Sequence, residues 1–424
     1  MALSDNDRSI AAFTVVAHAL VHWFELAVPI LLVVWLAEFE VSMTLVGVVV
    51  ALGYAPFGLG AVPAGLLVDR YRTKRLVVFC LAAMSLAFAS LAVAPSIYTI
   101  AASLLIWGVA ASIYHPAGLA LISTGVEDRG TVFAWHGIAG NAGIALGPFV
   151  TATLLLFFEW RLVIVLLALP GVVATVYGLR ARFDPTAALE DTVAADAART
   201  NSPTAVVANS RSLFASSFLL VFLVVTLVGL FYRGTLTYLP EILHGLSTMA
   251  DVSSPIDLEE LSLGDYVYVW VLVAGMAGQY AGGKLTDHVP VPRGLVVIFV
   301  VLAALALVFV PVAGLGIVAI VLFCGVLGFA LFAIEPFYQE AVAVYTPADT
   351  RGLSYGYTYL GMFGLGAASI SAGGVLLEAF TLGVFFASLS AVAVVGAAVA
   401  SLLVLNVGSH SSVSSSSPVS SDDD

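Results

Sequence analysis

The stretch GLLVDRYRTKR at residues 65–75 places one acidic and four basic residues between two long apolar runs. A shorter copy of its frame, GKLTD at residues 283–287, follows an apolar run in the second half of the chain. Glycine lets helices approach closely, and a carboxylate is favourable at the N-terminus of a neighbouring helix. We therefore predict loops that govern conformational change at Gly65, Asp69 and Arg70, and again at Gly283 and Asp287.

The two halves of the chain share three further pairs of segments in the same order. HWFELAVP at 22–29 matches RGTLTYLP at 233–240, IYHP at 113–116 matches AIEP at 333–336, and Arg-Gly occurs at 129–130 and 351–352. Membrane helices often contain proline and glycine, so one match alone carries little weight. Four matches in order indicate a duplicated unit of six helices, and parallel repeats of this kind form two bundles with a cavity between them.

The composition identifies lipid as the solvent of most of the chain. Of the 424 residues, 61% are hydrophobic and only 10% are charged, and the mean hydropathy is +1.07. Soluble domains are about 45–50% apolar and about 25% charged. The formal net charge of −12 also lacks the basic footprint of a nucleic-acid binder. These values exclude a soluble enzyme and a nucleic-acid-binding protein.

The apolar runs predict an all-α membrane protein with 12 transmembrane helices in two pseudo-symmetric six-helix bundles, because a spanning helix needs roughly 20 apolar residues. The expected spans are 10–36, 43–68, 76–94, 97–124, 131–157, 160–180, 213–243, 265–286, 294–312, 315–345, 352–378 and 381–406. We assign residues 1–180 to the first bundle, 181–212 to a cytoplasmic linker and 213–408 to the second bundle. The Ser- and Asp-rich tail, 409–424, is predicted to be disordered.

Basic residues predict the orientation of the helices. With the N-terminus inside the cell, every Lys and Arg except Arg161 and Arg233 falls at the cytoplasmic ends of the spans or in the linker. This asymmetry predicts a multi-pass protein of the cytoplasmic membrane with both termini in the cytoplasm. The excess of acids and the scarcity of lysine are typical of proteins from halophilic archaea.

The first expected helix carries His18, His22 and Glu25, whose spacings of four and three place them on one face. Ionisable groups are costly in lipid, so this face should line an internal cavity. The cluster is interpreted foremost as a proton relay or substrate contact, with a structural hydrogen-bond network as the alternative. A transition-metal site is disfavoured because no second cluster of soft ligands is evident. We predict no metal and no cofactor.

His115 and Glu335 occupy matching positions directly before Pro116 and Pro336. Proline frees a backbone carbonyl one turn earlier, and polar side chains gather at such helix breaks. Both side chains are predicted to carry protons, with a buried structural role as the alternative for each.

Arg233 lies within a predicted span, where it is expected to pair with Glu25 or Glu335 or to bind an anionic substrate. The predicted substrate contacts are His136, Asn141, Arg233, Gln339, Tyr355 and Tyr359.

Over residues 10–406 the chain resembles the major facilitator superfamily. The segment at 65–75 is similar to its signature loop, although Arg72 and Thr73 stand where Gly and Arg are usual. Three segments resemble the fosmidomycin-resistance-type branch: the pair His18 and His22 before Pro29, SIYHP at 112–116, and GNAGIALGP at 140–148. That branch usually has an acid where His22 stands. The resemblance implies an exporter of small, often anionic compounds driven by proton exchange.

We therefore predict a monomeric secondary transporter, and not an enzyme, that moves a small organic solute through a cavity lined by the first, fourth, fifth, seventh, tenth and eleventh helices. Its partners are the solute, protons as coupling ion and the lipid bilayer, with no nucleic acid. The expected direction is proton-coupled efflux. An importer or facilitator of a small metabolite is the alternative, and a membrane enzyme or receptor is less favoured because no catalytic constellation or sensory domain is evident.

Overall fold

The computed structural model describes residues 3–188, 203–250, 263–346 and 351–414, and every regular element in these ranges is a helix. The helices of the first half are α1 (Asp5–Glu38), α2 (Met43–Leu59), α3 (Ala61–Arg70), α4 (Thr73–Ser90), η1 (Leu91–Val93), α5 (Ile97–Ala111), α6 (Tyr114–Gly125), α7 (Arg129–Leu155) and α8 (Trp160–Arg180). The linker contains α10 (Pro203–Phe214).

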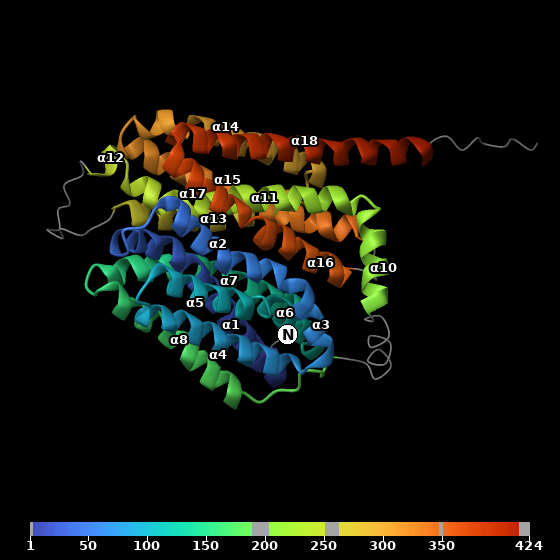
Figure 1. Ribbon diagram of the computed structural model, residues 1–424. Helices are drawn as coiled ribbons and strands as arrows, with labels where there is room; N and C mark the ends of the chain where they lie inside the picture. The colour runs from blue at the N-terminus through green and yellow to red at the C-terminus, as the bar shows by residue number, and fades with distance from the viewer. Residues whose placement is uncertain (1–2, 189–202, 251–262, 347–350, 415–424) are drawn as a thin grey trace, which may run out of the picture.

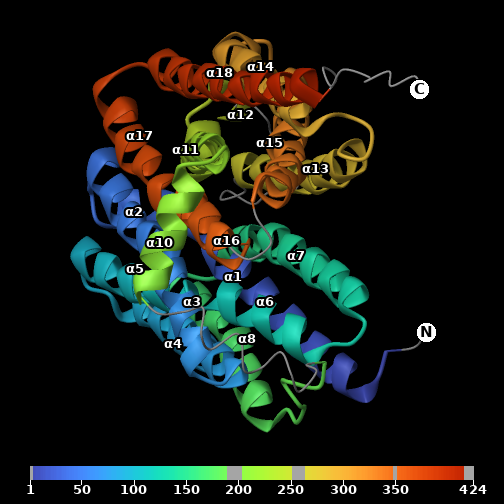
Figure 2. The same cartoon turned by 90° about the vertical axis from the view of Figure 1, so that its right-hand side faces the viewer.

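The second half follows the same plan. Its helices are α11 (Phe218–His244), α12 (Ser247–Ala250), α13 (Leu263–Leu285), α14 (Val291–Ala313), α15 (Ile317–Tyr345), α16 (Arg351–Tyr359), the π-helical segment η3 (Leu360–Leu365), α17 (Ala368–Ala379) and α18 (Leu382–Ser414). Figure 1 shows the first half, in blue to green, below the second half, in yellow to red. In the view of Figure 2 the two groups again lie on opposite sides of a central region, with α1, α7 and α16 near the boundary.

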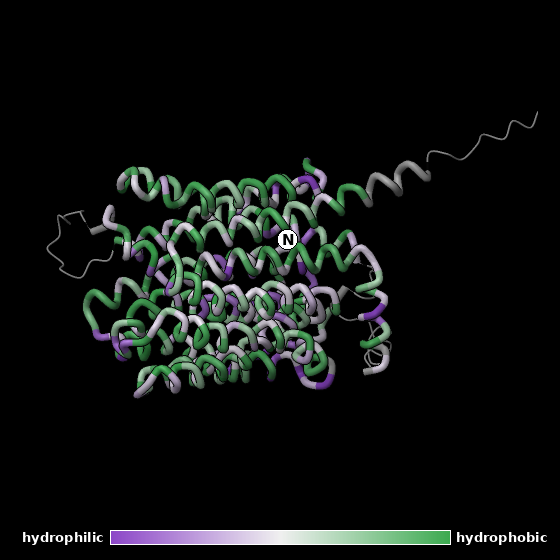
Figure 3. Tube along the Cα trace, turned by 45° about the horizontal axis from the view of Figure 1, so that its top comes forward, coloured by the Kyte–Doolittle hydropathy of each residue, from purple (hydrophilic) through white to green (hydrophobic). Residues whose placement is uncertain are grey.

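Eleven spans in the described part of the chain are long and apolar enough to cross a membrane. α13 completes the expected set of twelve, and Asp265, Gln279 and several glycines lower its hydropathy. It packs against α15 and α11, so much of its surface faces protein instead of lipid. Hydrophobic residues predominate along the helices in Figure 3, and hydrophilic residues gather mainly at helix ends. The predicted all-helical, twelve-span architecture is therefore confirmed.

Three predicted spans are each divided into two helices. α2 and α3 meet at Gly60, α5 and α6 meet at Ser112 and Ile113, and η3 separates α16 from α17. The close approach of helices explains the glycines here: a Cβ on Gly60 would collide with the Ser112 side chain. The break between α5 and α6 lies just before His115, as the proline pattern indicated, whereas α15 continues through Pro336 without a break.

The expected loop at 65–75 is mostly helical, which corrects the sequence-based prediction. α3 continues through Gly65, Asp69 and Arg70, because its proline, Pro63, lies in the first turn, where proline is tolerated. Only Tyr71 and Arg72 form the turn. Gly283 likewise lies within α13. Asp287 alone lies in a turn, between α13 and α14.

The other expectations on loops fall partly on undescribed residues. Residues 189–202 of the linker and 251–262 of the acidic segment before α13 lie outside the described residues. α18 extends to Ser414, beyond the start of the predicted tail at Ser409, and residues 415–424 lie outside the described residues.

The two halves meet closely at the end of the molecule where α2 begins and α17 ends. The backbone N–H of Thr44 donates to Oε2 of Glu378 at 2.8 Å. A Cβ on Gly374 would collide with the carbonyl oxygen of Met43, so only glycine permits this approach of α17 to α2. α7 and α13 also meet across the halves, with the rings of Phe149 and Tyr266 6.2 Å apart. This end is therefore closed by contacts between the halves.

This closure predicts a specific cross-link. With Cys80 and Cys324 replaced by alanine, the double variant Thr44→Cys, Glu378→Cys should react efficiently with a short bifunctional thiol reagent. Adding Gly374→Leu should reduce that yield strongly, because the new side chain would wedge α17 away from α2. Electrophoresis after proteolytic cleavage of the linker measures the cross-link, and the two single-cysteine variants are the controls. Equal yields with and without Gly374→Leu would contradict the close packing described here.

Candidate functional site

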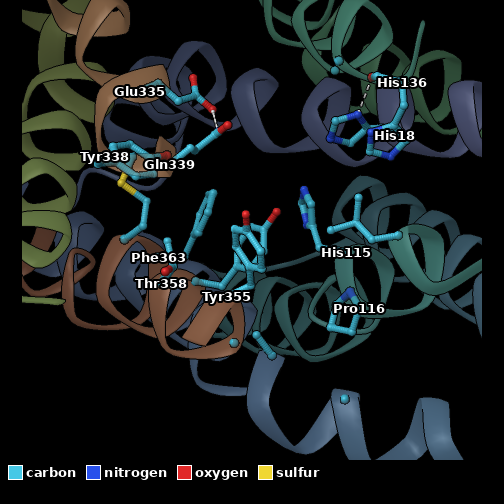
Figure 4. Close-up of a pocket in the computed structure, with 18 of the residues that line it drawn as sticks. His18, His115, Pro116, His136, Glu335, Tyr338, Gln339, Tyr355, Thr358 and Phe363 are labelled. Carbon is cyan, nitrogen blue, oxygen red and sulfur yellow. Dashed lines mark hydrogen bonds between the residues drawn. The ribbon is translucent and has the colours of Figure 1, made fainter. Parts of the chain in front are cut away.

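A cavity of about 860 Å³ lies between the two halves. All six helices predicted to line it contribute, and α3, α10 and α13 contribute as well. The cavity reaches α3, α10 and α16 at the end opposite the contact between Thr44 and Glu378. The predicted residues that line it are Gly65, His18, His22, Glu25, His115, His136, Asn141, Glu335, Gln339, Tyr355 and Tyr359. Figure 4 shows His18, His115 and His136 on one side, and Glu335, Gln339 and Tyr338 on the other.

The first-half wall is formed by four histidines from three helices. The rings of His18 on α1 and His136 on α7 stack with their centroids 3.8 Å apart, and Nδ1 of His18 donates to the carbonyl oxygen of His136 at 2.7 Å. Nε2 of His22 lies 3.2 Å from Nε2 of His18. The ring of His115, on α6, lies 5.3 Å from that of His18 and 5.5 Å from that of His22. Folding thus adds His115 and His136 to the pair that α1 provides.

Glu25 connects this wall to the second half of the protein. Its carboxylate accepts a hydrogen bond from Nδ1 of His22 at 2.6 Å and forms an ion pair with Arg233 on α11. Both charged side chains are buried, with 1% of Glu25 and 3% of Arg233 exposed. Of the roles considered for Arg233, the structure shows pairing with Glu25.

Aromatic rings enclose the guanidinium of Arg233. Its central carbon lies 4.4 Å from the ring centroid of Phe363 on η3 and 4.7 Å from that of Tyr54 on α2. Arg233 does not line the cavity. Its positive charge is therefore balanced within the protein by the Glu25 carboxylate and the faces of the aromatic rings.

Glu335 lies on the opposite wall and is held by amides instead of a cation. Nε2 of Gln279 on α13 donates to Oε2 at 2.9 Å, and Nε2 of Gln339, one turn along α15, donates to Oε1 at 3.1 Å. These are the two glutamines of the entire sequence. In the described part of the chain no cationic side chain forms an ion pair with Glu335. Glu335 is therefore the carboxylate of the cavity that has no cationic partner.

The sequence did not single out several residues of the site. Tyr54 donates to the backbone carbonyl of Glu25, and Tyr114 contacts Nε2 of His136 at 3.1 Å. Both belong to apolar segments in which a tyrosine usually packs or anchors. The sequence could have identified Gln279, because a glutamine inside an apolar span needs a polar partner. Of the other predicted residues, Arg70, Gly283 and Asp287 lie away from the cavity, while the side chain of Asp69 is not described.

The ion pair predicts a non-additive effect on stability. Glu25→Gln or Arg233→Gln alone should lower the free energy of unfolding by about 3–5 kcal/mol, because each leaves a buried charge without a partner. The double variant should recover much of this loss. The melting temperature of the purified protein measures the effect. Arg161→Gln, which breaks the exposed pair with Glu38, is the control and should change it little. Additive losses in the double variant would argue against the pair.

Comparisons with known proteins agree with this geometry. A family model described as Major Facilitator Superfamily matches residues 12–371. The structure of a variant of the nucleoside transporter NupG is similar, with 13% identity, a TM-score of 0.74, and coverage of 93% of this chain and 99% of that chain. A D-xylose-proton symporter has 14% identity, a TM-score of 0.72, and coverage of 93% and 97%.

A bacterial homologue of the human lysosomal transporter Spinster, in an inward-facing and occupied conformation, has 14% identity, a TM-score of 0.70, and coverage of 94% and 97%. At such identities the likeness establishes the fold alone. No curated protein sequence matches the chain. Because the family model covers most of its length, the chain belongs to the Major Facilitator Superfamily, and it is a membrane transporter of small solutes and not an enzyme.

Proposed function

We propose that this transporter exchanges a small polar organic solute for protons through the central cavity. Glu335 carries the proposal, because it lines the cavity, lies in the middle of α15 and has two amide donors but no cationic partner among the described residues. A charged carboxylate at such a place is costly, and binding a proton removes the charge. Glu335 can thus gain or lose a proton each time the cavity changes the side to which it opens.

The groups around Glu335 favour a role that is separate from the ion pair. Glu25, on α1, is already neutralised by Arg233. The other titratable groups that influence Glu335 electrostatically are His22 on α1, Tyr232 on α11, Tyr338 on its own helix and Tyr359 on α16. None of these carries a permanent positive charge, so none of the described groups around Glu335 can replace the proton as its partner. The proton roles predicted for His18, His22, Glu25 and His115 stay predictions.

The composition of the cavity wall favours a neutral or cationic solute. Its described lining includes no lysine or arginine. It offers amides and hydroxyls instead, and Asn141, Gln339, Tyr355 and Tyr359 are our proposed solute contacts. This differs from the anionic cargo implied by the fosmidomycin-resistance-type resemblance. Nucleosides and pentoses, which the names of two structural neighbours suggest, are suitable uncharged probes.

The distribution of basic residues supports an orientation. The cavity reaches α3, whose end carries Arg70 and continues into the basic turn before α4. By the positive-inside rule this end is cytoplasmic, so both termini are assigned to the cytoplasm and the structure is interpreted as inward-facing. α3 contacts α16 of the other half there, with the Val62 side chain 3.5 Å from the Cβ position of Gly356. We propose that these helices, with Gly65, Asp69 and Arg70, rearrange during transport, and that the direction is export.

The proton role of Glu335 has a direct test. Nucleosides and pentoses are first screened for thermal stabilisation of the purified protein, since a substrate binds the folded state preferentially. In proteoliposomes, Glu335→Gln should abolish accumulation driven by a pH gradient while retaining exchange of labelled for unlabelled solute. Glu340→Gln, on the same helix but outside the cavity lining, is the matched control and should behave as the wild type.

Several outcomes would contradict parts of the proposal. If Glu335→Gln retains gradient-driven accumulation, protons are not coupled through Glu335. If the solute moves in the same direction as the protons, the protein is an importer. If exchange of solute shows no response to the pH gradient, it is a facilitator. If no nucleoside or pentose stabilises the protein, the cavity does not accept this class of neutral solute.

A further inference from the structure

We propose that His18, His22 and His115 form a site for a divalent transition metal of the Zn²⁺ class on the first-half wall of the cavity. This inference goes beyond the proposed transport function and does not depend on Glu335. From the sequence we disfavoured a metal because no second cluster of soft ligands was evident beside His18, His22 and Glu25. The fold changes that assessment: one ligand atom from each of the three buried histidines lies within 4.8 Å of the others.

The hydrogen bonds of His18 and His22 determine which of their ring nitrogens are available. A carbonyl oxygen can only accept, so Nδ1 of His18 must donate to the carbonyl of His136. Nδ1 of His22 lies 2.6 Å from one carboxylate oxygen of Glu25, whose other oxygen pairs with Arg233, so Nδ1 is placed to donate there too. In neutral rings, Nε2 of both histidines therefore carries a lone pair.

Those two lone pairs face each other at 3.2 Å. Without a cation between them this contact is repulsive, so the geometry requires either a shared proton or a metal ion. A tetrahedral Zn²⁺ with bonds of about 2.0–2.1 Å holds two ligand nitrogens about 3.3 Å apart. The observed separation matches that value. Histidines four residues apart on one helix are also the spacing used in helical zinc sites.

The surroundings of the pair resemble those of known metal ligands. Histidines that bind metals usually donate their other N–H to a backbone carbonyl or a carboxylate, which fixes the ring and makes it a better ligand. His18 uses the carbonyl of His136 and His22 uses the carboxylate of Glu25. Both of these hydrogen bonds form in the protein without a metal ion. They orient two Nε2 atoms towards one point.

His115 distinguishes a metal from a shared proton. A proton between two histidines needs no third nitrogen, whereas Zn²⁺ takes at least three protein ligands in most sites. His115 is buried, with 5% exposed, and its Nδ1 has no hydrogen-bond partner among the described residues. A buried nitrogen without a partner is costly, and one ring nitrogen of His115 lies within 4.8 Å of the ligand atoms of His18 and His22. Three histidine ligands leave a fourth position, and all three residues line the cavity, so that position is open to water or solute.

The test uses the full-length protein without a histidine tag, stripped of metals by a chelator. Co²⁺ is the spectroscopic probe, and Zn²⁺ is titrated by competition and by its effect on the melting temperature. We expect one Co²⁺ per chain with the visible absorption bands of a tetrahedral site, displacement by Zn²⁺, and X-ray absorption by the Zn²⁺ form that indicates three imidazole ligands.

Variants assign the binding to this cluster. His115→Phe retains the ring beside Tyr359 and Phe57, and His115→Gln provides a second substitution if the first is poorly folded. Each should weaken Zn²⁺ binding at least about 10–100-fold, the loss caused by disturbing groups that only support ligands. His288→Gln, in the turn between α13 and α14, is the matched control and should bind as the wild type.

Three results would overturn the site. Absence of tetrahedral bands and of a Zn²⁺-dependent rise in melting temperature would show that His18 and His22 share only a proton. Unchanged affinity in both His115 variants, or an affinity lost in His288→Gln, would place the metal elsewhere. An X-ray absorption spectrum that indicates fewer than three imidazole ligands on Zn²⁺ would exclude His18, His22 and His115 as the ligand set. This result does not require either His115 variant to fold.

Discussion

The ion pair between Glu25 and Arg233 is the interaction on which the site depends. Charges inside a membrane protein are costly unless they are paired, and these two side chains come from different halves of the molecule. Their pairing binds α1 to α11 next to the cavity. It also leaves Arg233 outside the described lining of the cavity, which contains polar side chains but no lysine or arginine.

Pairing of Glu25 with Arg233 also gives the two walls of the cavity different chemical groups. On the first-half wall, His22 donates to Glu25 and thereby presents its other nitrogen to His18, so the ion pair indirectly orients the histidine cluster. On the second-half wall, none of the described cationic side chains pairs with Glu335, and the two glutamines of the chain donate to its carboxylate instead. A fixed charge pair, a cluster of imidazoles and an unpaired carboxylate thus lie around one space. Each has a different capacity to bind protons, metals or hydrogen-bonding solutes.

Close contacts between the halves provide the complementary constraint. Thr44 and Glu378 meet at one end of the molecule, where Gly374 permits α17 to approach α2. Near the other end, α3 and α16 are in contact beside the cavity. Opening the closed end would break these contacts between the halves, while the packing of helices within each half would stay in place. This arrangement accords with transport in which the cavity alternates between the two sides of the membrane.

The sequence by itself determined the number of spanning segments, the duplication and the residues that cannot face lipid. Apolar length and repeated landmarks are local properties, and the cost of burying an ionisable group applies wherever its helix lies. Most predicted site residues therefore line the cavity. Periodicity did not show that α3 extends through Arg70, because a polar end is compatible with either a loop or a helix.

The tertiary structure decided how those residues are paired. Arg233 had three candidate partners, and only the packing of α11 against α1 selects Glu25. His115 and His136 are about a hundred residues from His18 in the chain, so no spacing rule could bring them into one cluster. Gln279 reaches Glu335 because α13 packs on α15. Local patterns indicate which side chains need a partner. Contacts between helices that are distant in sequence determine which partner each side chain has.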